Sequence, residues 1–426
     1  MKLEVFSEIG RLRAVMTHRP GPEVDRMPPA LMEHLLFDDI LHGPSAREEH
    51  DAFTRAIEAF GVRNFDFQDL LREALAEDDT RTRRLVEQVI ERERLPAAAA
   101  GRLRELDADA LCDALVAGLP AGHDGMSGDY FFDLYPLPNL LMSRDPQVVL
   151  GNGVIIASMS RAAREREADL SRFVCATHPE LRDNPHWFDF DRDESATGAA
   201  RFGALTLEGG DVLVFREGVV CVGVSERTME RSIDLLADTL RGMDRFSHLI
   251  MVRMPSSRSQ MHLDTICTRI SEGECLVYPP MFEEGYAETL SVVSLELGKE
   301  SSDAGRRHRS FLDACRSAGV DLEPIPCGGP DDHIQQTREQ WTDGANSFAL
   351  APGLILLYDR NEATLEELDK RGYGAVSAES FAGNAERYVR GLEEGRRYVI
   401  TLTSAELSRA RGGPRCMTMP LERDPV

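Results

Sequence analysis

Short apolar runs separated by turn residues recur along most of the chain. Four segments share one order: an apolar strand, a tight polar or glycine turn, often a second apolar run, and then a helical stretch. They are residues 12–19 (LRAVMTHR), 148–159 (VVLGNGVIIASM), 210–225 (GDVLVFREGVVCVGVS) and 354–368 (LILLYDRNEATLEEL). This pattern predicts an α/β protein built from a repeated β-β-α module, with functional residues on the turns at one end.

Turn residues inside these segments predict where hairpins close and helices begin. The Gly-Asn-Gly of residues 151–153 and the Arg-Glu-Gly of residues 216–218 are typical of tight turns between two strands. Ser225 and Thr228 lie where a helix would start after the third segment, and Asn361 lies at the same place after the fourth.

The pattern changes between residues 66 and 117. Leucine, valine and isoleucine recur there at intervals of three and four, with arginine and glutamate between them. Asp79 and Thr80 offer a helix start, and Pro96 offers a break. We predict a helical bundle over residues 66–117, inserted into a catalytic β/α domain formed by residues 1–65 and 118–426, with its charges on a solvated face.

Charge and hydropathy limit the classes of partner. The 426 residues include 73 acidic and 49 basic ones, a formal net charge of −24. Because phosphate binding needs a basic surface, we expect no nucleic-acid partner. A cationic small substrate is compatible with this charge, although solubility alone also explains it. No apolar run approaches a membrane span, and the first residues lack the apolar segment of a signal peptide, so we expect a cytoplasmic protein without a membrane partner.

Cys416 is the strongest candidate for a reactive residue. The eight cysteines are scattered without a CxxC pair, which indicates neither a disulfide framework nor a thiolate zinc site. Cys416 lies in the segment RGGPRCMTMP, behind a glycine pair and near Arg411 and Arg415. Neighbouring positive charge should lower the pKa of its thiol toward neutrality and favour the nucleophilic thiolate. The alternative is a buried structural cysteine on the last strand.

Other polar clusters could supply partners for this thiol. Asp145 ends the segment NLLMSRD on a loop before a proline, and Glu208 opens the two-carboxylate turn EGGD. In MHLDT, a strand-like alternation would point His262 and Asp264 to the same side. A further cluster, GAN, follows the segment REQWTD at residues 338–343.

Each cluster also has a structural interpretation. Asp145 could be a turn residue, EGGD an ordinary hairpin turn, the His-x-Asp pair a surface or metal-ligand pair, and residues 338–341 a packed corner. The chain has no glycine-rich phosphate loop and no GxSxG elbow, which excludes nucleotide-binding and α/β-hydrolase interpretations. Together, a thiolate, a histidine and several carboxylates suit a planar cation such as guanidinium, which carboxylates bind through paired, charge-assisted hydrogen bonds.

With these residues assembled, the sequence resembles the arginine deiminases of the guanidino-group-modifying (pentein) superfamily. The segments that carry the resemblance are SEIGRLRAVMTHRPG (7–21), LLFDDIL (35–41), PLPNLLMSRDP (136–146), LEGGDVL (207–213), GVSERT (223–228), MHLDT (261–265), REQWTDGAN (338–346) and RGGPRCMTMP (411–420). The resemblance implies a five-bladed, pseudo-symmetric β/α propeller, the pentein fold, with an inserted helical bundle and the active site at the central axis.

The resemblance also implies roles for the five candidate catalytic residues. Cys416 would attack the guanidinium carbon, and His262 would protonate the departing ammonia and then act as base for the hydrolytic water. Asp145 and Asp264 would each bind guanidinium nitrogens. Glu208 would lie beside His262 and tune the local charge.

The substrate's amino-acid end is expected at four further positions, Asn139, Arg164, Arg227 and Arg411, with Met142 near the substrate. Two residues depart from the family pattern: Met142 replaces a common aromatic residue, and Ala410 replaces the usual glycine before the final arginine of the set.

The implied reaction is the hydrolysis of free L-arginine to L-citrulline and ammonia through a covalent thiouronium on Cys416. No metal and no organic cofactor is expected, because the thiol supplies the nucleophile and the carboxylates the electrostatics. The expected assembly is a homo-oligomer. Three alternatives stay open: a hydrolase of another guanidino compound, favoured by Ala410 and Met142, an amidinotransferase of the same fold, and a non-catalytic guanidino-binding protein.

Overall fold

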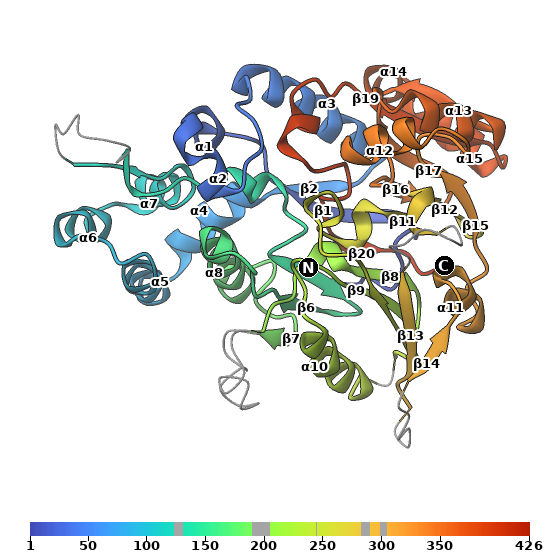
Figure 1. Ribbon diagram of the computed structural model, residues 1–426. Coiled ribbons are helices and arrows are strands. Elements are labelled where there is room, and N and C mark those ends of the chain that lie inside the picture. Colours follow the sequence, from blue (N-terminus) through green and yellow to red (C-terminus); the bar gives the residue numbers. More distant parts are fainter. Residues whose placement is uncertain (123–130, 190–204, 244, 283–289, 299–304) are drawn as a thin grey trace.

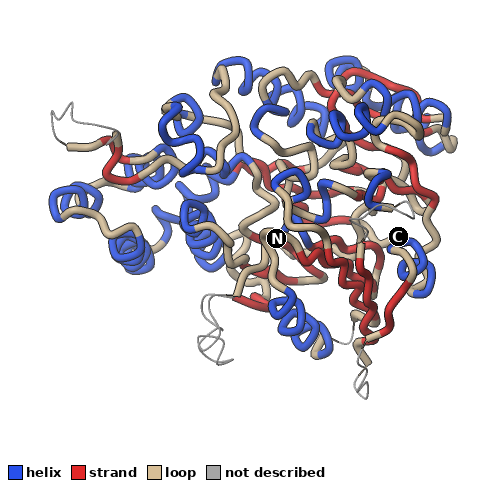
Figure 2. Tube along the Cα trace, viewed as in Figure 1, coloured by secondary structure: helices blue, strands red, loops and turns tan. Residues whose placement is uncertain are grey.

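The computed structural model describes residues 1–122, 131–189, 205–243, 245–282, 290–298 and 305–426 (Figure 1). Over these residues the strands form five sheets of three or more strands and one two-stranded ribbon. Figure 2 shows the strands gathered in the middle of the molecule, with helices mostly around them.

The five larger sheets repeat one topology. In each, two strands pair antiparallel and a third strand, reached through a crossover, pairs parallel to the second. In this order, the strands are β5 Gln147–Leu150, β6 Gly153–Ile156 and β7 His186–Asp189; β8 Val212–Arg216, β9 Val219–Val224 and β10 His248–Arg253; β11 Cys267–Arg269, β12 Glu274–Val277 and β15 Glu323–Pro326; β16 Phe348–Ala351, β17 Leu354–Tyr358 and β19 Arg397–Leu402; and β20 Met419–Arg423, β1 Leu12–Thr17 and β2 Arg63–Asp66.

Three further strands extend these sheets: β13 Ser291–Glu296 beside β10, β14 Arg306–His308 beside β13, and β18 Tyr373–Ser377 beside β19. Two more strands, β3 Leu119–Pro120 and β4 Phe132–Leu134, form the ribbon. The helices of the crossovers are α1 Pro22–Asp25, α2 Met32–Leu35 and α3 Gly43–Ala59; α8 Ala162–Thr177; α10 Glu230–Arg241; α11 Phe311–Ser317; and α13 Glu362–Lys370, α14 Ala378–Gly383 and α15 Ala385–Glu393. Helix α12, His333–Trp341, lies between β15 and β16. A parallel partner requires such a crossover, so the topology confirms the predicted β-β-α repeat.

The predicted hairpins are confirmed, and one predicted helix start is wrong. Leu150 pairs with Gly153 across the first turn, and β8 and β9 flank the second. Asn361 directly precedes α13, as predicted. Helix α10 begins only at Glu230, because Ser225 forms a turn instead, its hydroxyl accepting hydrogen bonds from the backbone N–H groups of Arg227 and Thr228.

Helices α4 Phe67–Glu77, α5 Asp79–Arg92, α6 Ala97–Arg104 and α7 Ala108–Ala117 occupy the segment predicted to be helical. Helix α5 starts one residue earlier than predicted, because the carboxylate of Asp78 accepts hydrogen bonds from the N–H groups of Thr80 and Arg81. The apolar side chains of α4, α5 and α7 pack in one hydrophobic cluster with α8 and strands β1, β5, β6 and β20. The four helices therefore share their core with two of the sheets, and the division into two domains stays a prediction. Across the described residues, every helix is too short or too polar to cross a membrane.

Five turns, each just before the first strand of one of the five sheets, meet in a closed ring, and we call them the central turns. They are residues 143–146, 209–211, 263–265, 342–346 and 414–417. Each turn is hydrogen-bonded to the next: Gly209 N–H to the Asp145 carbonyl at 2.9 Å, Leu263 N–H to Asp211 Oδ1 at 2.9 Å, Asn346 Nδ2 to the Asp264 carbonyl at 3.0 Å, Cys416 N–H to Asn346 Oδ1 at 3.2 Å, and Arg144 N–H to the Cys416 carbonyl at 3.1 Å. This cyclic order is the one that a five-bladed propeller requires.

Candidate active site

The central turns bring the five predicted catalytic residues into one buried cluster. Asp145, Asp264 and Cys416 belong to these turns, whereas Glu208 and His262 each directly precede one. Cys416, 5% exposed, is the most accessible of the five. Residues separated by up to 271 positions are thus neighbours, because each sheet contributes one turn to the ring.

His262 and Asp264 do not follow the predicted strand alternation, and that prediction is wrong. Residues Leu263–Thr265 form a 3₁₀ turn, held by the bond from Leu263 N–H to Asp211 and by Thr265 Oγ1, which donates to the His262 carbonyl at 2.7 Å. As a result the two side chains have different partners. His262 contacts carboxylates, whereas Asp264 accepts a hydrogen bond from Arg415.

His262 lies between two carboxylates and on top of a glycine. Its Nε2 is 2.8 Å from Glu208 Oε2, and its Nδ1 is 3.6 Å from Asp145 Oδ1. A Cβ atom at Gly210 would be 2.5 Å from Nδ1, so only glycine fits beneath the ring. Burial lowers the pKa of His262, but Asp145 and the hydrogen bond to Glu208 outweigh it and raise the pKa to about 9. Burial acts to raise the pKa of Glu208, yet His262 holds it at about 2. The pair is therefore an imidazolium and a carboxylate at neutral pH.

Cys416 has an electronegative environment, contrary to the prediction from its neighbours in sequence. Its Sγ is 3.7 Å from Asp264 Oδ2. The Arg415 guanidinium is paired with Glu8 and Asp264, and the Arg411 guanidinium lies 3.6 Å above the Trp341 ring centre. Burial, followed by the charge of Asp264, raises the pKa of the Cys416 thiol well above its ordinary value. The expectation of a lowered thiol pKa is wrong, because adjacency in sequence does not fix where arginine side chains point.

The support of the Cys416 turn includes two residues that sequence analysis missed. Glu8 forms a two-pronged pair with Arg415, at 2.9 and 3.0 Å, and Arg415 also donates to Asp264 at 2.8 Å. Asn346 accepts hydrogen bonds from the N–H groups of Arg415 and Cys416. Glu8 and Asn346 both lie in segments that carry the family resemblance, but nothing beside them in sequence indicates what they contact.

Two of the predicted substrate-binding arginines have buried donors without a hydrogen-bond partner in the described part of the chain. In Arg227, which is 1% exposed, these are Nε and Nη1, and in Arg411 the donor is Nε. Arg164 is already engaged: it donates to Asp145 at 2.7 Å, to Glu167 at 2.7 Å and, through Nη2, to the Asn139 carbonyl at 3.4 Å. Binding a substrate carboxylate at Arg164 would require it to exchange one of these partners.

The remaining predicted substrate residues line the edge of the cluster. The Asn139 amide donates to the Leu35 carbonyl at 2.6 Å. Met142 packs against the backbone before the cysteine, since a Cβ at Gly412 would be 2.1 Å from its Sδ. Met142, Ala410 and Cys416 belong to one hydrophobic cluster. Of the two departures from the family pattern, Met142 therefore lies close to the Cys416 turn, and Ala410 belongs to the same hydrophobic cluster.

Two buried carboxylates were present in the sequence clusters but were not predicted as site residues. Asp343 has a left-handed backbone, φ 62°, and burial raises its pKa to about 7. Asp211 is fully buried, and burial raises its pKa to about 6. Asp211 ends the segment EGGD, which sequence analysis interpreted as a possible hairpin turn, and Asp343 ends the segment REQWTD.

Asp145, Glu208 and His262 could also hold a metal ion, because one ligand atom from each lies within 4.8 Å of the others. However, Arg164 Nη1 is 2.7 Å from Asp145 Oδ2 and 4.0 Å from Glu208 Oε2, so a divalent cation would meet a guanidinium at close range. The arrangement suits a delocalised organic cation better.

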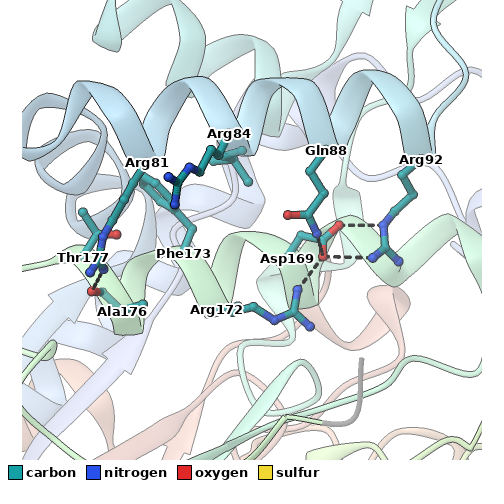
Figure 3. A pocket seen from close by; sticks show the side chains of 10 residues that line it. Arg81, Arg84, Gln88, Arg92, Asp169, Arg172, Phe173, Ala176 and Thr177 are labelled. Atoms are coloured by element: carbon teal, nitrogen blue, oxygen red, sulfur yellow. Dashed lines mark hydrogen bonds and ion pairs between the residues drawn. The ribbon is translucent and has the colours of Figure 1, made fainter. Parts of the chain in front are cut away.

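A groove of about 710 Å³ lies elsewhere, between α5 and α8 (Figure 3). Arg92 and Arg172 converge there on the buried carboxylate of Asp169. None of the residues that line this groove belongs to the predicted site.

The fold of this chain is similar to that of proteins with solved structures. The crystal structure of the N-terminal domain of ArgZ, an arginine dihydrolase of the ornithine–ammonia cycle in cyanobacteria, matches 96% of this chain and 97% of its own, with 13% identity and a TM-score of 0.50. A second structure of that domain, bound covalently to a reaction intermediate, also has a TM-score of 0.50, at 12% identity, and covers 96% of this chain and 98% of its own. These likenesses confirm the predicted pentein-type α/β fold.

Several sequence relatives share one name. "Arginine deiminase" of Listeria welshimeri is 34% identical over 99% of this chain and 98% of its own length. The protein of that name in Clostridium perfringens is 34% identical over the same shares, and that of Borrelia recurrentis is 32% identical over 100% of this chain and 98% of its own. A model of the family described as arginine deiminase matches residues 33–423. With the buried thiol, histidine and carboxylates in the ring of central turns, these matches establish that this chain belongs to the arginine deiminase family.

Proposed function

We propose that the protein hydrolyses the guanidinium group of free L-arginine, giving L-citrulline and ammonia. The observation that carries this proposal is the single buried cluster in which a thiol, an imidazolium and several carboxylates converge. The cluster's net negative charge suits a cationic substrate, and membership of the arginine deiminase family supports arginine as that substrate.

Binding would place the guanidinium between Asp145 and Asp264, which accept charge-assisted hydrogen bonds from its nitrogens. The unpartnered Nε and Nη1 of Arg227 are suited to the substrate carboxylate, because a buried guanidinium without acceptors is costly until one arrives. Burial lowers the pKa of Arg227, and a bound carboxylate would offset this effect. Arg164 and Asn139 would complete the carboxylate site after exchanging their present partners.

The first chemical step is attack of the Cys416 sulfur on the guanidinium carbon. Burial and the surrounding carboxylates keep the thiol protonated when no cation is present. The positive charge of the substrate beside Sγ offsets these carboxylates and lowers the thiol pKa, so the thiol releases its proton to water and the thiolate forms when the guanidinium is in position. The S–C bond forms, the C=N electron pair moves to nitrogen, and a tetrahedral adduct results.

His262 would then donate its proton to the departing nitrogen. Its pKa of about 9 keeps the imidazole protonated at neutral pH, which is the form that a general acid needs. Ammonia leaves, and the carbon stays attached to Cys416 as an S-alkylthiouronium. The imidazole, now neutral, removes a proton from water, and the resulting hydroxide attacks the same carbon. Collapse of that adduct breaks the S–C bond and releases citrulline.

A hydrolase of another guanidino compound is a second candidate, because Met142 and Ala410 depart from the family pattern and share the hydrophobic cluster of Cys416, with Met142 packed against Gly412. An amidinotransferase and a non-catalytic binding protein are the remaining alternatives. A ureido colorimetric assay with arginine, canavanine, agmatine and methylated arginines distinguishes the substrates. Ornithine formation in the presence of glycine would identify a transferase, and calorimetric arginine binding without citrulline would identify a binding protein.

The variant Cys416→Ala tests the mechanism. It should abolish citrulline formation, and Asp145→Ala should cause kcat/KM to collapse, because the guanidinium loses its orientation. Cys112→Ala is the matched control: it removes another buried free thiol, in helix α7, and should turn over arginine. Wild-type activity in Cys416→Ala would exclude the proposed nucleophile.

We also infer a cytoplasmic location, since all eight cysteines are buried free thiols, as is usual in a reducing compartment. The homo-oligomeric state stays a prediction, which sedimentation of the purified protein tests.

A further inference from the structure

Asp211 is a fully buried carboxylate that the proposed mechanism does not use. It ends the turn of residues 209–211 and lies at the start of β8. We propose that Asp211 is the positioning residue of the site, which fixes the His262 turn, ties it to the loop of Arg227, and holds His262 in its protonated form. This inference rests on the proposed function and assigns a further residue to it.

The contacts of Asp211 join the two segments. Its Oδ1 accepts a hydrogen bond from Leu263 N–H, at 2.9 Å, between His262 and Asp264 in the chain. Its Oδ2 accepts one from the Ser225 hydroxyl at 2.6 Å. The same hydroxyl oxygen accepts the Arg227 N–H at 2.9 Å. A single carboxylate therefore connects the candidate general acid to Arg227, whose Nε and Nη1 lack a hydrogen-bond partner in the described residues.

The contacts continue to the partner of His262. Thr228 Oγ1 accepts the N–H of Glu208 at 3.1 Å, and Thr228 N–H donates to the Ser225 hydroxyl at 3.1 Å. Glu208 in turn holds His262 Nε2. The loop of residues 225–228 and the two central turns thus form a closed hydrogen-bond circuit in which Asp211 provides the link to the His262 turn.

The neighbouring strand limits the space around the Asp211 side chain. A Cβ atom at Gly223, on β9, would be 2.2 Å from Asp211 Oδ1. Strand β9, which pairs with β8, therefore has no room for a side chain at residue 223. A residue that served only to cap a turn would not need a glycine on the neighbouring strand.

The charge of Asp211 acts on His262 together with that of other groups. Asp145, from another central turn, and Glu208, which directly precedes the turn of Asp211, favour the imidazolium as Asp211 does, whereas burial opposes it. Arg164 and Arg227 are the cations that face the same carboxylates. Because Asp211 has no cationic side chain hydrogen-bonded to it in the described residues, its charge is not neutralised by an ion pair.

The variant Asp211→Asn keeps the shape of the side chain and removes its charge. The basic limb of the kcat/KM profile, set by loss of the His262 proton, should move to lower pH by about one unit. Ser225→Ala is the matched control, because it removes the hydroxyl and leaves the carboxylate. It should raise KM for arginine through the loosened Arg227 loop and leave the basic limb where it is in the wild type.

A second readout does not require turnover. The imidazole proton shifts of His262, identified by their absence in His262→Ala, report its pKa by NMR, and circular dichroism verifies that each variant is folded. A lower His262 pKa in Asp211→Asn supports the proposal even if wild-type protein turns over no arginine, a result that would refute the proposed function instead. An unchanged His262 pKa, or activity lost equally at every pH, would overturn the assignment of Asp211.

Discussion

Replacing Gly210 by alanine should disable the site through one added methyl group. Gly210 lies under the imidazole of His262, and it is not among the glycines with a positive φ, so the backbone accepts alanine. The added Cβ would lie 2.5 Å from Nδ1 and 2.6 Å from Cγ of His262. The effect of the substitution is therefore confined to the position of the ring.

The size of the effect follows from these distances. Ordinary contact begins near 3.4 Å, so the ring has to move away by about 1 Å. Its 2.8 Å hydrogen bond to Glu208 would then exceed the range of such bonds, which ends near 3.2 Å. Misplacement of a catalytic group by about 1 Å costs on the order of 100-fold in rate, or about 2.7 kcal/mol in the barrier.

The assay is kcat/KM for arginine at fixed pH, with Gly101→Ala as control. Gly101 lies in α6, and its added Cβ would meet no atom within 4 Å. That variant should keep wild-type kcat/KM and gain about 0.5–1 kcal/mol in the free energy of unfolding, because alanine favours the helix. Wild-type kcat/KM in Gly210→Ala would refute the packing of His262 on this glycine.

Three further predictions concern charge. Glu208→Gln should lower the pKa of His262 from about 9 toward its ordinary value, so the basic limb of the kcat/KM profile should move to lower pH; an unmoved limb would contradict the ion pair. In the free protein, the rate of Cys416 alkylation by iodoacetamide, followed by peptide mass spectrometry, should keep rising beyond pH 9, and a plateau near neutrality would show a lowered thiol pKa instead. Burial acts to raise the pKa of Glu8, but Arg415 lowers it from 4.5 to about 2, so this carboxylate stabilises the fold above pH 4.5 and loses that effect as the pH falls through 2. Glu8→Gln should cost about 3–5 kcal/mol in denaturant unfolding at pH 7, because Arg415 stays buried without its partner, and a cost below about 1 kcal/mol would disprove that dependence.

Local patterns predicted the repeated module well, because strand, turn and helix preferences act over a few residues. The segments at residues 148–159 and 210–225 contain long apolar runs, and both fold as the pattern indicates. The sheet of β11, β12 and β15 was not recognised. Strand β11 contains the polar residues Thr268 and Arg269, and β12 begins with Glu274, so no continuous apolar run marks these strands in the sequence.

The residue types of the site and their arrangement in space depend on different information. The residue types of the cluster were found from motifs, since thiol, histidine and carboxylates near glycine turns are chemically conspicuous. The directions of the Arg411 and Arg415 side chains could not be predicted, because their partners lie far away in the sequence. Trp341 is 70 residues from Arg411, and Glu8 is 407 residues from Arg415. Asp211 was not predicted as a site residue for the same reason. Its partners, Ser225 and Leu263, come within hydrogen-bonding distance only after two strands have paired.

The ring of central turns needs one turn from every sheet. The loss of activity on unfolding should therefore report the opening of the least stable sheet. Native proteins open locally, unit by unit, with free energies below that of global unfolding. Each of the five sheets holds one link of the ring, so the opening of any one sheet breaks it while the other four stay folded. As denaturant is added, arginine turnover should therefore fail before circular dichroism records unfolding, at the concentration set by the weakest of the five sheets.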